Sequence, residues 1–179
     1  MSWRAYELRP DPEPTLDPVG EYLRDIWAES VMPMAAERGM TLSLPPVQPR
    51  SRLAHIAAAY AAGQGRSAEM RRAIFQAFFE RGENIGLLSV LSRLATDIGL
   101  EAAQLAEAVG FGEIAQQVLD DAELARELSL GGVPAIVLRR TGAPFEQAVL
   151  LEGAQSYEAI MEVVGQVARG EIQPNPGEE

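Results

Sequence analysis

The sequence contains no cysteine and only one histidine, His55. Without cysteine the chain can form no disulfide, no thiolate metal site and no thiol nucleophile. Zinc sites usually need several histidine or cysteine ligands, so a single histidine also argues against zinc. The sequence has no GxGxxG, Walker or GxSxG motif either. This chemistry indicates a chain that is not a self-sufficient enzyme, and we expect no catalytic residue, no metal and no resident cofactor.

Lysine is absent as well, and all 15 basic residues are arginines scattered along the chain. With 26 acidic residues the net charge is −11, which repels the phosphate backbone of nucleic acids and anionic lipid surfaces. No apolar run approaches the roughly 18 residues that a membrane span requires, and the first 14 residues contain no apolar signal core. We therefore expect a cytoplasmic protein with no nucleic-acid or membrane partner.

Most of the sequence shows helical periodicity. Between residues 51 and 110 apolar side chains recur every three or four positions, interrupted only by glycines, and a further helical pattern covers residues 113–128. These patterns predict a helical sub-domain within residues 15–128, with short connections between antiparallel helices. We interpret Asp120 and Asp121, near the end of this region, as part of a solvated helix face.

Signals for β structure lie at both ends of the chain. The stretch "SWRAYELRP" alternates apolar and polar residues and predicts a strand over residues 3–9. The runs "PAIVL" and "AVLLEG", with Gly142 between them, predict an antiparallel hairpin. Ser156 and Gly170 are typical of the start and the end of a helix that follows the hairpin. The acidic, Pro- and Gly-containing tail, residues 171–179, is predicted to be disordered.

The order of these elements, and several motifs within them, resemble the DsbA-like branch of the thioredoxin superfamily. "WRAYELRPD" resembles its second strand, "RLAHIAAAYAAGQG" its Ala-His helix, "GGVPAIVL" its cis-proline turn and "LLEGAQSYE" its last strand and helix start. The most similar members are those grouped with hydroxychromene-carboxylate isomerases and kappa-class glutathione transferases. The resemblance implies an α/β fold, an incomplete thioredoxin-like fold with a large helical insertion. Residues 1–14 and 129–170 would form the thioredoxin-like sub-domain, residues 15–128 the insertion and residues 171–179 the tail.

The resemblance also implies a substrate site. In the family the cis-proline turn lies against the redox centre and presents backbone groups to an extended peptide or a thiol substrate. Val133 and Pro134 occupy that turn here, so we expect a cis bond between them. His55 matches the Ala-His position of the family, where it is either a group lining the substrate groove or a hydrogen-bonded histidine between the two sub-domains.

The family's catalytic segment has no counterpart in this sequence. Family members begin with a strand, a CxxC or serine motif and a helix, whereas only Met1 and Ser2 precede "WRAYEL" here. Either the chain begins downstream of its natural start, or it is a cysteine-free relative used for binding. We therefore expect a DsbA-family thiol-disulfide oxidoreductase-like protein that is redox-inactive as it stands. The alternatives are a non-catalytic peptide-binding or scaffold module and a glutathione-dependent isomerase or transferase, for which glutathione would be the cofactor.

The missing strand predicts a change in the sheet. In the thioredoxin topology that strand lies between the one resembling "WRAYEL" and the one resembling "PAIVL", and unpaired backbone groups on both sides would cost about 1 to 3 kcal/mol each when buried. Either these two segments pair directly in a three-stranded sheet, or a second copy of the chain covers the exposed edge. We expect a homodimer that buries this edge.

Overall fold

The computed structural model describes residues 1–110 and 112–171, which belong to two compact units, Met1–Leu124 and Ala125–Glu179. By their contacts residues 1–14 belong to the first unit. The predicted division, in which residues 1–14 and 129–170 form one thioredoxin-like sub-domain, stays a prediction. Of the tail predicted to be disordered, residues 172–179 lie outside the described part of the chain.

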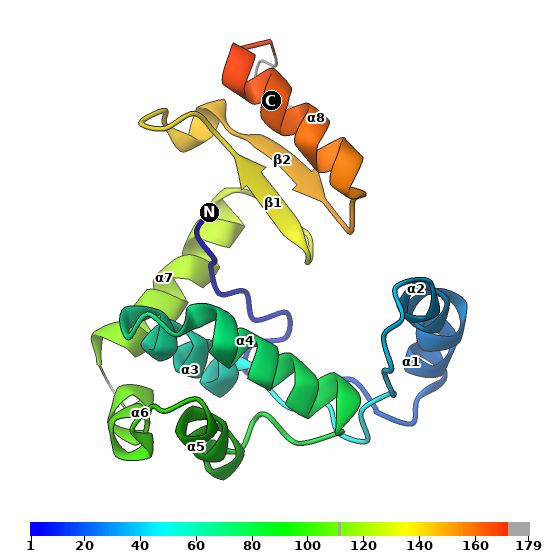
Figure 1. Cartoon of the computed structure of the whole chain (residues 1–179), viewed down its shortest axis with the longest axis vertical. Coiled ribbons are helices and arrows are strands. Elements are labelled where there is room, and N and C mark those ends of the chain that lie inside the picture. The colour runs from blue at the N-terminus through cyan, green and yellow to red at the C-terminus, as the bar shows by residue number, and fades with distance from the viewer. Residues whose placement is uncertain (111, 172–179) are drawn as a thin grey trace. The chain divides into compact units, whose positions relative to one another are not determined.

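Helices make up the first unit, and a hairpin and a helix make up the second (Figure 1). The elements of the first unit are α1 (Glu21–Ile26), η1 (Trp27–Val31), α2 (Met32–Glu37), α3 (Arg52–Gly63), α4 (Ser67–Phe75), η2 (Gln76–Glu80), α5 (Leu88–Asp97) and α6 (Ala102–Val109). The helix α7 (Glu113–Glu127) runs from the first unit into the second, which continues with β1 (Ala135–Leu138), η3 (Phe145–Gln147), β2 (Val149–Glu152) and α8 (Tyr157–Arg169).

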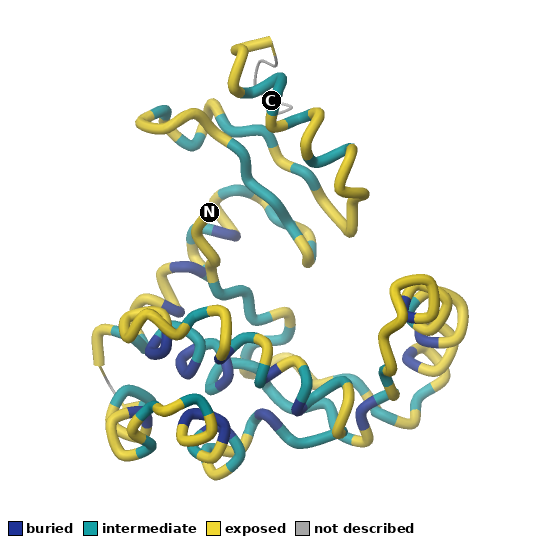
Figure 2. Tube along the Cα trace, in the orientation of Figure 1, coloured by how far each residue is buried: buried dark blue, intermediate teal, exposed yellow. Residues whose placement is uncertain are grey.

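A hydrophobic core joins α3, α4, α5 and α6 in the first unit. It is formed where α3 contacts α4, α5 and α6, and Figure 2 shows buried residues concentrated along these helices. Met70, Leu91, Leu94 and Leu105 are its largest fully buried hydrophobic side chains. The helical periodicity predicted for residues 51–110 is confirmed, because the residues repeating at spacings of three and four are those facing this core.

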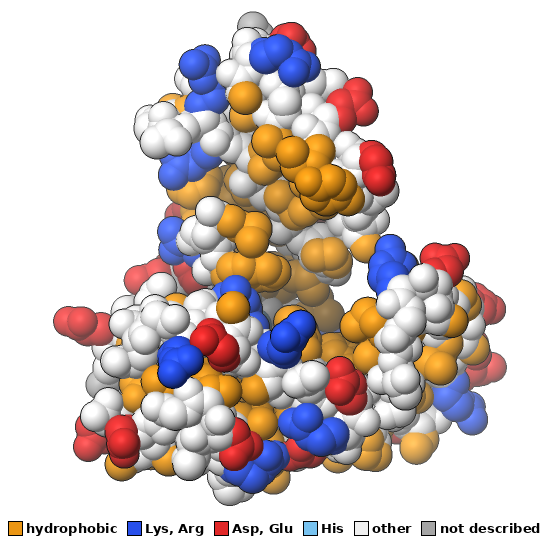
Figure 3. All heavy atoms as spheres, in the orientation of Figure 1, with side chains coloured by type: hydrophobic (Ala, Val, Ile, Leu, Met, Phe, Trp, Pro, Cys, Tyr) orange, Lys and Arg blue, Asp and Glu red, His pale blue; other side chains and the backbone are white. Residues whose placement is uncertain are grey.

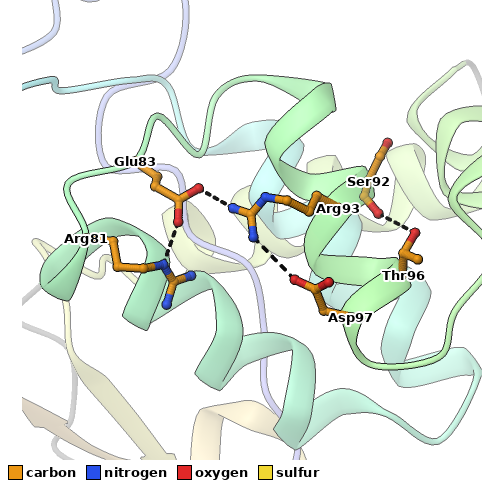
Figure 4. A network of polar contacts seen from close by, with 6 residues as sticks. All are labelled: Arg81, Glu83, Ser92, Arg93, Thr96 and Asp97. Carbon is orange, nitrogen blue, oxygen red and sulfur yellow. Dashed lines mark hydrogen bonds and ion pairs between the residues drawn. The ribbon is translucent and has the colours of Figure 1, made fainter.

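Two arginines hold the loop between η2 and α5. The Glu83 carboxylate accepts hydrogen bonds from Arg81, which precedes it in the loop, and from Arg93 on α5, and Arg93 also pairs with Asp97 at 3.2 Å (Figure 4). The hydrogen bond from Arg81, followed by that from Arg93, lowers the pKa of Glu83. The two arginines are exposed and Glu83 is partly exposed, so solvent screens their attraction. Their effect is therefore to fix the path of residues 81–87 rather than to add much stability.

In the second unit β1 and β2 form an antiparallel hairpin, with Ala135 opposite Glu152 and Leu138 opposite Val149. The hairpin prediction is therefore confirmed. The Ser156 hydroxyl accepts a hydrogen bond from the backbone N–H of Ala159 at 3.1 Å, and Gly170 ends α8. At Gly170 φ is +73°, a left-handed conformation that glycine adopts without a steric cost.

The prediction of a strand over residues 3–9, here called the N-terminal segment, is wrong. It lies without regular secondary structure, and the described residues form a two-stranded sheet of β1 and β2 alone, so the three-stranded alternative is wrong too. A strand needs a neighbouring strand to satisfy its backbone N–H and C=O groups. In this segment side chains of the helical unit bond those groups instead. Among the described residues no helix is long and apolar enough to cross a membrane.

Candidate functional site

The predicted substrate-binding residues Val133 and Pro134 lie together in the bend that precedes β1. The Val133–Pro134 peptide bond is cis. The Pro134 carbonyl accepts a hydrogen bond from the backbone N–H of Gly153 at 2.8 Å, which ties the bend to the end of β2. Within the described residues the backbone N–H and C=O of Val133 make no hydrogen bond, and the residue is 53% exposed. The bend therefore presents one free backbone donor, one free acceptor and an apolar side chain.

The third predicted residue, His55, lies in the first turn of α3 within the other unit. Its Nε2 is 3.0 Å from the backbone carbonyl of Tyr6 in the N-terminal segment. Because a carbonyl can only accept, the imidazole must carry its proton on Nε2. Burial lowers the pKa of His55, while the Tyr6 carbonyl and the negative charges of Glu7 and Asp121 oppose that shift. In the folded chain His55 is thus a neutral hydrogen-bond donor that holds the N-terminal segment.

The stability of the chain should therefore depend on the protonation of its single histidine. An unperturbed histidine has a pKa of about 6.5, and burial lowers that of His55 in the folded chain. The unfolded chain thus binds this proton more readily, so the His55 contribution to stability is complete above pH 6.5 and is lost as the pH falls from there toward the folded pKa.

In an NMR titration we expect the Hε1 proton resonance of His55 to titrate with a midpoint below 6.5. In His55→Gln, which keeps a donor, the loss of stability between about pH 7 and 5.5 should be smaller than in the wild type. A midpoint at or above the ordinary value would contradict this account.

Asp121, which we expected on a solvated face, is 5% exposed and holds the N-terminal segment as well. One carboxylate oxygen accepts a hydrogen bond from the Arg4 guanidinium at 2.7 Å, and the other accepts one from the backbone N–H of Ala5 at 2.9 Å. A buried carboxylate is costly unless such donors surround it. The interpretation of Asp121 as solvated is therefore wrong, whereas its neighbour Asp120 is exposed and bonds Gln116 on the same helix.

The sequence did contain a signal for the buried position. Val118 and Ala125 are 3% and 5% exposed, and Asp121 lies three residues after the first and four before the second. That spacing places all three on one face of α7. An acid in an apolar stripe indicates a buried carboxylate with a partner far away in the sequence, but the pattern cannot say which partner it is.

Two further arginines at the start of α3 complete the attachment of this segment. The Nε and NH2 groups of Arg52 each lie 2.9 Å from the same oxygen of Glu7, whose side chain is 5% exposed. Arg50 donates to the Arg9 carbonyl at 3.1 Å and pairs with Asp11 at 2.9 Å. The backbone of the segment is thus bonded by an acid, a histidine and an arginine, each from the helical unit.

The described residues do not hold three or more histidines, cysteines, aspartates or glutamates in a group that could bind a metal ion. Of the predicted site residues, Val133 and Pro134 share one bend, and His55 belongs to the first unit. The bend offers backbone hydrogen bonding and an apolar contact.

Comparison with known proteins defines the class. The model of the DSBA-like thioredoxin domain matches residues 1–165, and this chain therefore belongs to the DsbA-like thioredoxin family. The uncharacterized protein YwbO of Bacillus subtilis is 31% identical over 162 residues, covering 83% of this chain and 80% of that protein.

Solved structures agree with this fold. A probable DsbA oxidoreductase from Streptomyces coelicolor is 22% identical, with a TM-score of 0.71, and the match covers 98% of this chain and 78% of that one. A candidate protein disulfide isomerase from Nitrosomonas europaea is 15% identical, with a TM-score of 0.68 over 86% of this chain and 78% of that one. The predicted fold class, a DsbA-like thioredoxin fold with a helical insertion, is thereby confirmed.

Proposed function

We propose that this chain is the substrate-binding part of a DsbA-like thiol-disulfide system, and that it captures an extended peptide at Val133 and Pro134 without exchanging electrons itself. The observation that carries the proposal is the free backbone of Val133 in an exposed bend. The absence of cysteine supports the second part, because a thiolate is the nucleophile of thiol-disulfide exchange.

The surroundings of the bend favour an approaching peptide. A β-carbon added at Gly132 would meet no atom within 4 Å, so there is open space on that side of the backbone. An extended peptide can pair its main chain with the free N–H and C=O of Val133, while the valine side chain contacts an apolar residue of the peptide. Binding of this kind depends little on the peptide sequence, as suits a family whose neighbours include disulfide oxidoreductases.

The test is the binding of a labelled, carboxymethylated insulin B chain, an unfolded peptide without a free thiol, measured by fluorescence anisotropy. Val133→Asp should weaken binding by about tenfold, since it places an unpaired charge in the apolar contact. Val19→Asp, at an exposed valine of the first unit, is the matched control and should bind like the wild type.

A parallel assay tests the lack of redox activity: neither variant nor the wild type should reduce insulin disulfides above the buffer rate. Equal binding by the wild type and Val133→Asp would refute the site, and turnover by pure protein would refute the lack of redox activity.

We also propose that the chain forms a homodimer. Tyr157, Met161 and Val164 follow one another at spacings of four and three on α8 and are 72%, 46% and 36% exposed. Figure 3 shows hydrophobic side chains gathered over this helix in the second unit. An exposed apolar stripe of this kind supports self-association.

A further inference from the structure

A pocket of about 370 Å³ lies in the first unit, and its lining does not include the residues assigned above to peptide binding. Its lining includes Glu7, Asp11, Pro49, Arg50, Arg52 and Leu53. The loop between η2 and α5 adds Asn84 and Gly86, and the ion pairs of Glu83 hold that loop in place. The volume is in the range of sites for small ligands.

The charges of this lining are balanced. Glu7 pairs with Arg52 and Asp11 pairs with Arg50, so the two carboxylates and two guanidiniums sum to zero. The Glu7 side chain is 5% exposed. Arg52 donates a hydrogen bond from Nε to one carboxylate oxygen, and the other oxygen is buried without a hydrogen-bond partner. Asp11 is 74% exposed and supplies the more accessible carboxylate. The carboxylate of Asp11 can therefore accept further hydrogen bonds from a ligand, whereas Glu7 contributes a buried negative charge.

Positively charged groups line the same pocket as these carboxylates. The 12-residue helix α3 begins at Arg52, and no side chain caps its first turn, so the partial positive charge of a helix N-terminus adds to the two guanidiniums. A carboxylate would be stabilised there. Pro49 and Leu53 provide apolar surface beside the charged groups.

We propose that this pocket binds a small zwitterion, a ligand that carries an α-ammonium group, a carboxylate and an apolar side chain. The ammonium group pairs with the exposed carboxylate of Asp11 and is attracted by the buried charge of Glu7, and the ligand carboxylate pairs with Arg50, Arg52 and the start of α3. A phosphate or another plain anion would meet two carboxylates, and a plain cation would meet two guanidiniums, so neither matches the balanced lining. A free α-amino acid and a dipeptide both carry the required groups.

The experiment is isothermal titration calorimetry at low ionic strength with four probes. L-leucine and L-leucyl-L-leucine carry both charges, N-acetyl-L-leucine lacks the ammonium group and L-leucinamide lacks the carboxylate. We expect saturable binding of at least one of the first two, with each blocked leucine at least about tenfold weaker. The free amino acid binding more tightly supports a single-residue ligand, and the dipeptide binding more tightly supports a peptide source. Equal binding of blocked and unblocked leucine, or no saturation by either zwitterion up to about 10 mM, overturns the proposal.

Variants then locate the site. Asp11→Asn changes an exposed side chain, should leave the fold intact, and should weaken the tighter zwitterion by several-fold. Glu7→Gln removes a buried negative charge and should weaken it by several-fold. Glu69→Gln is the matched control, because Glu69 also pairs with an arginine, Arg66, but does not line the pocket. Circular dichroism checks that each variant is folded, and an unchanged affinity in folded Asp11→Asn and Glu7→Gln overturns the assignment.

Discussion

Replacing Leu91 with alanine is expected to lower the free energy of unfolding of the helical unit by about 3 kcal/mol. Leu91 lies on α5 and is 0% exposed, within the core cluster that α3, α4, α5 and α6 share. Truncation removes the apolar contacts of the side chain and leaves a cavity that the surrounding helices can close only in part. This loss is a large fraction of the stability of a typical domain.

The measurement is urea unfolding followed by circular dichroism at 222 nm, which reports mainly on the helical unit. The midpoint should shift to lower urea while the slope stays unchanged, since the surface exposed on unfolding hardly changes. Leu87→Ala is the control, because Leu87 directly precedes the same helix but is 50% exposed. Its cost should stay below about 1 kcal/mol. Equal shifts for the two variants would mean that α5 does not pack as described.

Replacing Asp121 with alanine is expected to cost about 2 kcal/mol and to release the N-terminal segment. The substitution leaves the backbone N–H of Ala5 without its acceptor and removes the partner of Arg4. The Ala5 bond should account for most of the loss, because the Arg4 side chain is 55% exposed and solvent screens its attraction. Asp121→Asn keeps the shape of the side chain and should cost less.

Asp120→Ala provides a neighbouring control. Asp120 is exposed, and its hydrogen bond from Gln116 lies within α7. Its removal should change the free energy of unfolding by less than about 0.5 kcal/mol in the same urea experiment. Trypsin should cleave after Arg4 faster in Asp121→Ala than in Asp120→Ala. If cleavage is equally fast in both, Asp121 does not anchor the segment.

The elements set by local patterns could be predicted from the sequence. The helices between residues 51 and 110 and the hairpin of β1 and β2 each follow from a repeating side-chain spacing, and the ends of α8 follow from Ser156 and Gly170. The substrate-site residues Val133 and Pro134 came from the family resemblance, and whether they bind substrate stays a prediction. Spacing alone would not have distinguished their bend from any other turn before a strand.

The features that could not be predicted depend on partners far away in the chain. The pattern of residues 3–9 is that of a strand, but whether a strand forms depends on a neighbour that alternation cannot reveal. The same limit applies to Asp121, whose bonds to Arg4 and Ala5 span more than a hundred positions. The pocket beside α3 was also missed, since its two ion pairs join residues about 40 positions apart.

The attachment of the N-terminal segment has a consequence for how this protein can change during evolution. In a β-ladder the backbone of one strand bonds the backbone of the next, so few single substitutions remove such a bond. Here the Ala5 N–H, the Tyr6 carbonyl and the Arg9 carbonyl each depend on one side chain, Asp121, His55 and Arg50 respectively. Each of those bonds can therefore be lost or regained by a single codon change, independently of the others. The hold on this segment can be weakened or strengthened in small inherited steps without altering the helices that provide it.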